Sequence, residues 1–171
     1  MKIAVVSDSH IGQRISAFPL DFIKRISNID AIVHCGDYTS MDAVKILMEK
    51  ADFFGVYGNM DDDDVRKALP EIKIFNVENF SIAITHGWGS PYSIDERVYA
   101  FIRENHPDKK FDLIFYGHSH IPSDTSIEGT RLLNPGALSG NIGEKFGSFG
   151  ILSVDGDTID WKIEKILPKN F

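Results

Sequence analysis

Asp8 and His10 are the first side chains in the chain with the types and spacing of metal ligands. They follow a short apolar run, residues 2–6, and a glycine comes soon after them. A run of this length that ends in polar residues predicts a buried strand. Residues two apart on a strand project to the same side, so the carboxylate and the imidazole can converge beyond the strand end. Ligands of α/β proteins bind in that crevice, so the pair predicts half of a metal site.

Four further apolar runs end in residues of the same kind, at residues 31–35, 53–57, 80–85 and 112–116. With the first run they supply seven donors, namely Asp8, His10, Asp37, Asn59, His86, His118 and His120. We expect these donors to gather at one sheet edge, where seven suffice for two metal ions. Imidazole, carboxylate and amide ligands suit Mn, Fe, Zn or Ni, whereas a thiolate-bound structural zinc needs more than the single cysteine present.

Each motif taken alone also has an ordinary structural explanation. A glycine followed by Asp, Asn or His after a strand is commonly a turn or a helix cap. Five such endings, which use four of the six histidines, favour a shared metal site instead. Of the other histidines, His34 is predicted to be a hydrogen-bonded core residue and His106 a surface loop residue. Residues 61–64 are predicted to begin a solvated helix, in which Asp61 could orient a metal ligand.

The elements between these strands must position the donors. Apolar residues at helical spacing predict helices over residues 17–29, 40–50, 65–69 and 93–104. Residues 72–77 and 80–85 are predicted to be neighbouring strands. From residue 121 onward the pattern changes to short strands near 131–133, 147–154 and 158–163. We expect this last part of the chain to form a mostly antiparallel sheet packed beside the first sheet.

Length and composition limit the possible classes of protein. A chain of 171 residues with 43% hydrophobic residues predicts one folded domain over residues 1–171. No apolar run approaches the roughly 20 residues of a membrane span, and the first strand lacks the features of a signal peptide, so a cytoplasmic protein is expected. The net charge of −7 argues against stable binding of duplex nucleic acid, but it does not exclude anionic substrates beside bound cations. Oligomeric state stays open, and a homo-oligomer is compatible with the sequence.

With these residues in place, the chain resembles the calcineurin-like metallophosphoesterases, and most closely their small single-domain prokaryotic phosphodiesterase branch. The motifs that carry the resemblance occur in family order and span most of the chain: Asp8-Ser9-His10, Gly36-Asp37, Gly58-Asn59-Met60-Asp61, Thr85-His86-Gly87 and Gly117-His118-Ser119-His120. The resemblance implies an α/β fold, a four-layer α/β/β/α sandwich in which helices flank two packed mixed sheets.

The resemblance also implies how the donors divide between two divalent ions. One ion takes Asp8, His10 and His120, the other takes Asn59, His86 and His118, and Asp37 bridges them. Mn is the first candidate, with Ni, Fe, Co and Zn as alternatives. Two cations about 3.5–4 Å apart can hold a hydroxide that attacks a phosphate ester. Asp37, Asn59, His86 and His118 are therefore expected to be catalytic as well as ligating, in a phosphodiesterase that acts on a small phosphodiester or phosphoester.

Two points leave alternatives open. Much of the wider family has a histidine where this chain has Met60, and a thioether cannot protonate a leaving oxygen. The sequence therefore does not identify a general acid. The second function considered is a non-catalytic metal-binding scaffold for protein interactions on the same fold, as the retromer subunit with this architecture is. The presence of all seven donors favours the enzyme, while the physiological substrate and the native metal stay undetermined.

Overall fold

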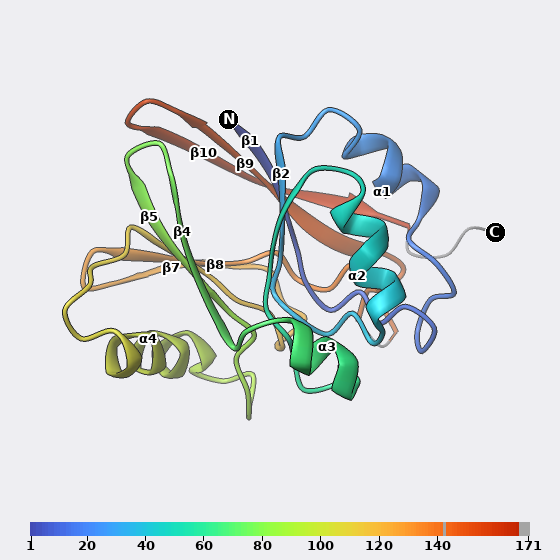
Figure 1. Cartoon of the computed structure of the whole chain (residues 1–171), viewed down its shortest axis with the longest axis horizontal. Coiled ribbons are helices and arrows are strands. Elements are labelled where there is room, and N and C mark those ends of the chain that lie inside the picture. The colour runs from blue at the N-terminus through green and yellow to red at the C-terminus, as the bar shows by residue number, and fades with distance from the viewer. Residues whose placement is uncertain (142, 168–171) are drawn as a thin grey trace.

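Two five-stranded mixed sheets pack face to face and carry helices on their outer faces (Figure 1). The computed structural model of the chain describes residues 1–141 and 143–167. The first sheet has the order β10-β9-β1-β2-β3 and consists of β1 (Lys2–Val6), β2 (Ala31–His34), β3 (Asp52–Gly55), β9 (Gly147–Asp155) and β10 (Thr158–Ile166). The second has the order β4-β5-β6-β8-β7 and consists of β4 (Ile72–Val77), β5 (Phe80–Thr85), β6 (Leu113–Phe115), β7 (Ser123–Ile127) and β8 (Thr130–Asn134).

Three apolar layers separate four layers of secondary structure, which confirms the predicted α/β/β/α sandwich. One apolar layer lies between the sheets, where Ile3 and Val5 of β1 are fully buried. The alternate residues Ala4 and Val6 face the outer layer formed by α1 (Leu20–Arg25), α2 (Met41–Met48) and α3 (Asp63–Ala68). The third apolar layer lies under α4 (Ile94–Asn105), which covers the second sheet. Burial of β1 on both faces explains why its sequence is an unbroken apolar run.

The last part of the chain does not form a sheet of its own, so that prediction was wrong. β8 pairs in parallel with β6 and antiparallel with β7, and both extend the second sheet. β9 instead pairs antiparallel with β1, and β10 follows it, so both extend the first sheet. Alternating patterns identify strands but carry no information about which sheet edge each strand joins. In the structure β9 occupies the edge of β1 opposite β2, and β8 occupies the edge of β6 opposite β5. β7 was missed because its sequence is largely polar.

None of the helices in the described part of the chain has the length and apolar composition needed to cross a membrane.

Candidate metal centre

Loops that follow five strands bring the seven predicted donors together. The loops after β1, β2 and β3 belong to the first sheet, and those after β5 and β6 belong to the second. The expectation of one sheet edge was therefore wrong, because the donors meet where the carboxyl ends of strands from both sheets converge. Backbone hydrogen bonds tie these loops to one another, such as that from the Gly117 N–H to the His86 carbonyl at 3.0 Å.

Asp8, His10 and His120 form a first group of potential ligands, whose ligating atoms all lie within 4.8 Å of one another. The Nε2 atoms of His10 and His120 are 3.5 Å apart. Asp8 Oδ1 lies 3.0 Å from His120 Nε2 and 3.8 Å from His10 Nε2. Asp8 is fully buried, and its other oxygen, Oδ2, accepts hydrogen bonds from the Ser7 hydroxyl at 2.5 Å and the His118 N–H at 3.0 Å. The carboxylate is thus fixed with one oxygen directed at the two imidazoles.

Asn59, His86 and His118 form a second group. His86 Nδ1 donates to the Cys35 carbonyl at 2.6 Å, and His118 Nε2 donates to the Gly89 carbonyl at 2.9 Å. Because a carbonyl only accepts, the remaining nitrogen of each neutral ring presents a lone pair. These nitrogens, His86 Nε2 and His118 Nδ1, lie 3.1 Å and 2.9 Å from Asn59 Oδ1, which is itself an acceptor. Three lone pairs therefore converge on one position, which suits a cation.

Asp37 lies between the two groups. Its Oδ2 is 3.8 Å from His10 Nε2 on one side and 3.3 Å from His86 Nε2 on the other. Its Oδ1 accepts the Met60 N–H at 2.7 Å, which fixes the carboxylate. This carboxylate can therefore contact two ions at once.

One buried oxygen of the cluster lacks a hydrogen-bond partner that a metal ion would replace. Within residues 1–141 and 143–167, Asp8 Oδ1 accepts no hydrogen bond, although His120 Nε2 lies 3.0 Å away. His10 Nδ1 is also unpaired, but the His10 ring directs Nε2 and not Nδ1 at the cluster. Buried polar groups are normally paired, because an unpaired one costs free energy. Carboxylate, imidazole and amide donors are those that Mn, Fe, Zn and Ni accept. The residues present therefore fit divalent metal ions.

The charges of the cluster are strongly coupled. Burial alone raises the pKa of Asp37, but the hydrogen bond and charge of His86 outweigh it, so the pKa lies below its usual value. The pKa of Asp8 is likewise lowered against the effect of burial, by contact with His120 and the charge of His86. Burial lowers the pKa of His86, yet Asp37, Asp8 and the Cys35 carbonyl together raise it to about 9. In the metal-free protein a proton on His86 therefore occupies the place of a cation.

Five of the seven donors have left-handed backbone conformations, which are rare for residues with a side chain. Their φ angles are 53° at Asp8, 45° at His10, 61° at Asp37, 67° at His118 and 60° at His120. Such conformations cost roughly 1–3 kcal/mol each and tend to cluster at functional sites, although Glu78 and Glu128 adopt them in ordinary hairpin turns. Close packing of the loops also requires glycine, because a Cβ at Gly58 or Gly117 would collide with the side chains of Asp37 or Ser7. The loops are therefore shaped for the positions of the donors at a cost in stability.

Asp61 supports the cluster without joining it. Its buried carboxylate accepts the backbone N–H groups of Asp37 at 3.0 Å, Gly58 at 2.7 Å and Thr39 at 2.7 Å. It thereby joins the loop after β2 to the loop after β3. The neighbouring Asp62 has the ordinary role predicted for the acidic run, since it accepts the Val65 N–H at 3.0 Å and caps α3.

The remaining histidines have different surroundings. His34 is fully buried, stacks on Tyr38 with ring centroids 3.7 Å apart, and accepts the Gly36 N–H at Nδ1. Its Nε2 therefore donates to the Ser9 hydroxyl, 2.9 Å away. Burial lowers the pKa of His34 to about 3, so the ring is neutral. These contacts confirm the hydrogen-bonded core histidine, whereas His106 is half-buried at the end of α4.

The sequence did not single out two arginines that contact the site. Arg14 Nη1 lies 3.1 Å from His120 Nδ1 and 3.5 Å from the Gly140 carbonyl. Arg66 donates to the carbonyls of Asn59 at 2.7 Å and Asp61 at 2.9 Å. Arg14 could have been found from its place four residues after His10 in the same loop. Arg66 gave no such signal, because a basic residue in the last turn of a short helix is common.

Curated relatives cover nearly the whole chain. A probable metallophosphoesterase of Methanothermobacter thermautotrophicus is 30% identical over 164 residues, which are 95% of this chain and 91% of the relative. A phosphodiesterase of Methanocaldococcus jannaschii is 25% identical over 159 residues, with 83% of this chain and 87% of that protein covered.

Solved structures share the fold. The solution structure of Thermotoga maritima protein TM1076 superposes with a TM-score of 0.75 at 32% identity and covers 96% of this chain and 99% of that one. Vps29 of Entamoeba histolytica in complex with Zn²⁺ superposes with a TM-score of 0.74, with 99% of this chain and 100% of that one covered, and at 21% identity it shows the fold alone. The calcineurin-like phosphoesterase superfamily domain matches residues 1–157, and the chain belongs to this family.

Proposed function

We propose that this protein is a divalent-metal-dependent phosphodiesterase that hydrolyses small phosphate esters. The observation that carries the proposal is the convergence of the seven predicted donors: Asp8, His10 and His120 lie together, Asn59 Oδ1 approaches His86 and His118, and Asp37 lies between the two groups. Membership of the phosphoesterase family and the phosphodiesterase from Methanocaldococcus jannaschii support the same reaction class. Mn is our first candidate for the metal, with Ni, Fe, Co and Zn as alternatives.

In this proposal each donor has a defined role. Asp8, His10 and His120 hold one ion, Asn59, His86 and His118 hold the other, and Asp37 contacts both. Two ions at these positions would act as Lewis acids toward the phosphoryl oxygens and activate a water for attack on phosphorus.

The chain itself sets the charge and orientation of this site. Asp8 and Asp37 stay ionised at neutral pH because their pKa values are lowered. The Cys35 and Gly89 carbonyls each accept one ring N–H, from His86 and His118, so each ring presents a lone pair toward the centre when it is neutral, as it would be with a metal bound. Met60 is 46% exposed but carries no acidic proton, so it cannot serve as the general acid. Met60, the residue that follows Asn59, therefore donates no proton to the leaving oxygen of the ester.

An activity screen tests the proposal. Chelated protein would be assayed with p-nitrophenyl phosphate and bis(p-nitrophenyl) phosphate after separate addition of Mn, Ni, Co, Fe, Mg and Zn. We expect hydrolysis of the diester to return with at least one of these metals. Stoichiometric metal binding without turnover of either ester would refute the proposed enzyme. An Asp37→Asn variant of equal stability serves as the matched control for contaminating phosphatases.

The second candidate is a metal-binding scaffold for protein interactions. It is favoured by one observation, the superposition over the whole chain with Vps29, a protein whose structure has been solved with bound Zn²⁺. A scaffold would need metal only to hold the shape of its loops. It would therefore bind metal but hydrolyse neither ester. The same screen therefore separates the two candidates.

A further inference from the structure

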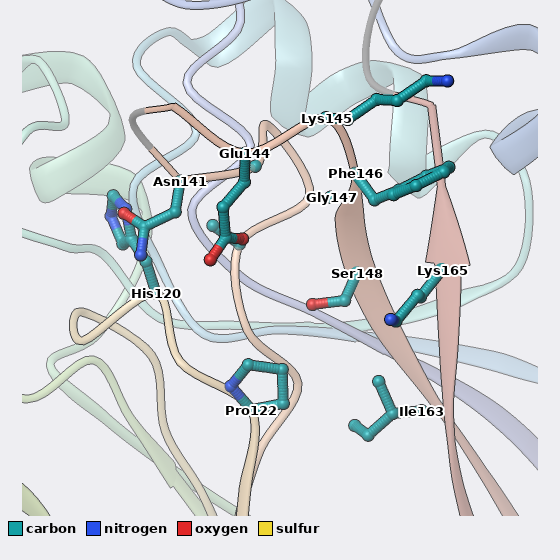
Figure 2. Close-up of a pocket in the computed structure, with 12 residues that line it drawn as sticks. His120, Pro122, Asn141, Glu144, Lys145, Phe146, Gly147, Ser148, Ile163 and Lys165 are labelled. Carbon is teal, nitrogen blue, oxygen red and sulfur yellow. The ribbon is translucent and has the colours of Figure 1, made fainter.

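A cavity of about 330 Å³ opens beside the candidate metal centre. His120 forms one wall, and the segment around Glu144 and the ends of β9 and β10 form the others (Figure 2). Its size is at the lower end of pockets that hold small organic ligands. Because His120 is a proposed metal ligand as well as a wall, the cavity adjoins the metal centre, and it can take the ester group of a phosphate bound there.

Lys165 and Ser148 also line this cavity and lie away from His120 in Figure 2. They are directly paired residues on β10 and β9, so their side chains lie on one face of the sheet. The Ser148 hydroxyl donates to the Pro135 carbonyl at 2.7 Å, which fixes this wall. Lys165 has no ion-pair partner among the residues that the structure describes, and its ammonium points into the cavity in Figure 2. A free cation at this position can receive an anionic group.

Glu144 lies on the same side of the cavity as His120, and its carboxylate is directed inward in Figure 2. Glu144 is exposed, and no salt bridge joins its side chain to another residue of the described ranges, so its oxygens are accessible as acceptors. A carboxylate here repels an anion but accepts hydrogen bonds from hydroxyl groups. The cavity therefore presents an acceptor for hydroxyls and a cation, with Ile163 and Pro122 as apolar walls.

We propose that this cavity binds the alcohol part of the substrate and selects phosphoesters whose alcohol is hydroxylated and carries a second anionic group. The hydroxyls donate to Glu144, and the second anion binds Lys165. The inference rests on the proposed function, because it assumes that the reacting phosphate occupies the metal centre. Arg14 contacts His120 and the Gly140 carbonyl, which both belong to cavity-lining residues, and so brings a further positive charge close to the cavity.

Calorimetric binding of sugar phosphates to the metal-loaded protein tests the inference without a need for turnover. The probes are fructose 1,6-bisphosphate and the two monophosphates, fructose 1-phosphate and fructose 6-phosphate. We expect the bisphosphate to bind at least about tenfold more tightly than either monophosphate, a difference of about 1.4 kcal/mol. Lys165→Met should remove this advantage. Lys162→Met is the matched control, because Lys162 lies on the opposite face of β10 and pairs with Asp160 at 3.0 Å. This variant should still bind the bisphosphate more tightly than the monophosphates.

A second comparison tests Glu144. The wild-type protein should prefer fructose 1,6-bisphosphate over hexane-1,6-diol bisphosphate, which has no hydroxyls, and Glu144→Ala should lose this preference. Equal affinity for the bisphosphate and the monophosphates, or an advantage that survives Lys165→Met, would overturn the inference. Failure of the proposed function gives a different result, since the protein would then hydrolyse no ester whatever the binding data show.

Discussion

The acidic run Asp61–Asp64 allows a graded test of how the metal-binding loops are held. Asp61 accepts three backbone N–H groups in the interior, Asp62 accepts one at the start of α3, and Asp63 is exposed. Replacing each in turn by alanine removes three, one and no such bonds in the same short segment. The series therefore isolates the role of the loops from that of the helix.

The magnitudes follow from the contacts. Removal of Asp61 leaves three N–H groups without their acceptor, at roughly 1–3 kcal/mol each when buried. Burial raises the pKa of Asp61, so the lost carboxylate was itself costly to bury, and this offsets part of the loss. We therefore expect Asp61→Ala to lower the free energy of unfolding by about 3 kcal/mol. Asp62→Ala should cost about 1 kcal/mol as a lost helix cap, and Asp63→Ala less than about 0.5 kcal/mol as a surface change.

Urea unfolding of the metal-free variants measures these differences, and an unchanged m-value would show that the unfolded states are comparable. Asp61→Ala should also bind metal more weakly than Asp62→Ala, because Asp37 and Asn59 lie on the two loops that Asp61 joins. A cost for Asp61→Ala no larger than that for Asp62→Ala would refute the reasoning.

Asp37→Asn should reduce metal content and turnover more than Asn59→Ala, because Asp37 contacts both groups of ligands; metal analysis with rate measurements checks this, and an equal or smaller loss would contradict the bridging role. His34→Gln should lower the melting temperature while the rate per folded molecule persists, and a stable variant without turnover would contradict its structural role. Metal affinity should rise about tenfold per pH unit between pH 7 and 8 and level off above about pH 9, because the metal displaces the proton of His86, whose pKa is raised to about 9. Calorimetry of metal binding across this pH range checks the prediction, and an affinity that does not change with pH would refute it. Without an acid at Met60, alkyl esters should react about 10²–10⁴-fold more slowly than aryl esters, and a series of graded leaving groups would show a shallow dependence if another residue donates the proton.

Most of the fold, and the approach of the seven candidate donors to one another, could be predicted from the sequence because their signals are local. A buried parallel strand is a continuous apolar run, and the donors follow directly where each run stops, as at Asp8 and His10. The same signals do not encode contacts between distant segments. Nothing in β9 indicated that it pairs with β1, so the sequence placed the last strands in a sheet of their own.

The supporting residues show the same limit. Asp61 was identified as a candidate to orient a ligand from its position two residues after Asn59, but its three N–H partners come from two loops and required the structure. Arg14 was missed because its partner His120 is 106 positions away in the chain. Lys165 and Ser148 were missed because they meet only through the pairing of β10 with β9, and Ser148 is held by Pro135, 13 positions earlier. Residue spacing thus predicts functional side chains that come directly after the end of a strand. It fails for contacts that depend on which strands pair at the edges of the sheets.

A titration of the chelated protein with Mn²⁺ tests the central claim most directly, with metal binding and hydrolysis of bis(p-nitrophenyl) phosphate followed in the same samples. Two groups of donors that share Asp37 predict that turnover rises until two equivalents are bound and then stays constant. Full turnover without metal, or two bound equivalents of Mn²⁺ without turnover, would contradict the claim that this cluster is a dinuclear phosphoesterase centre.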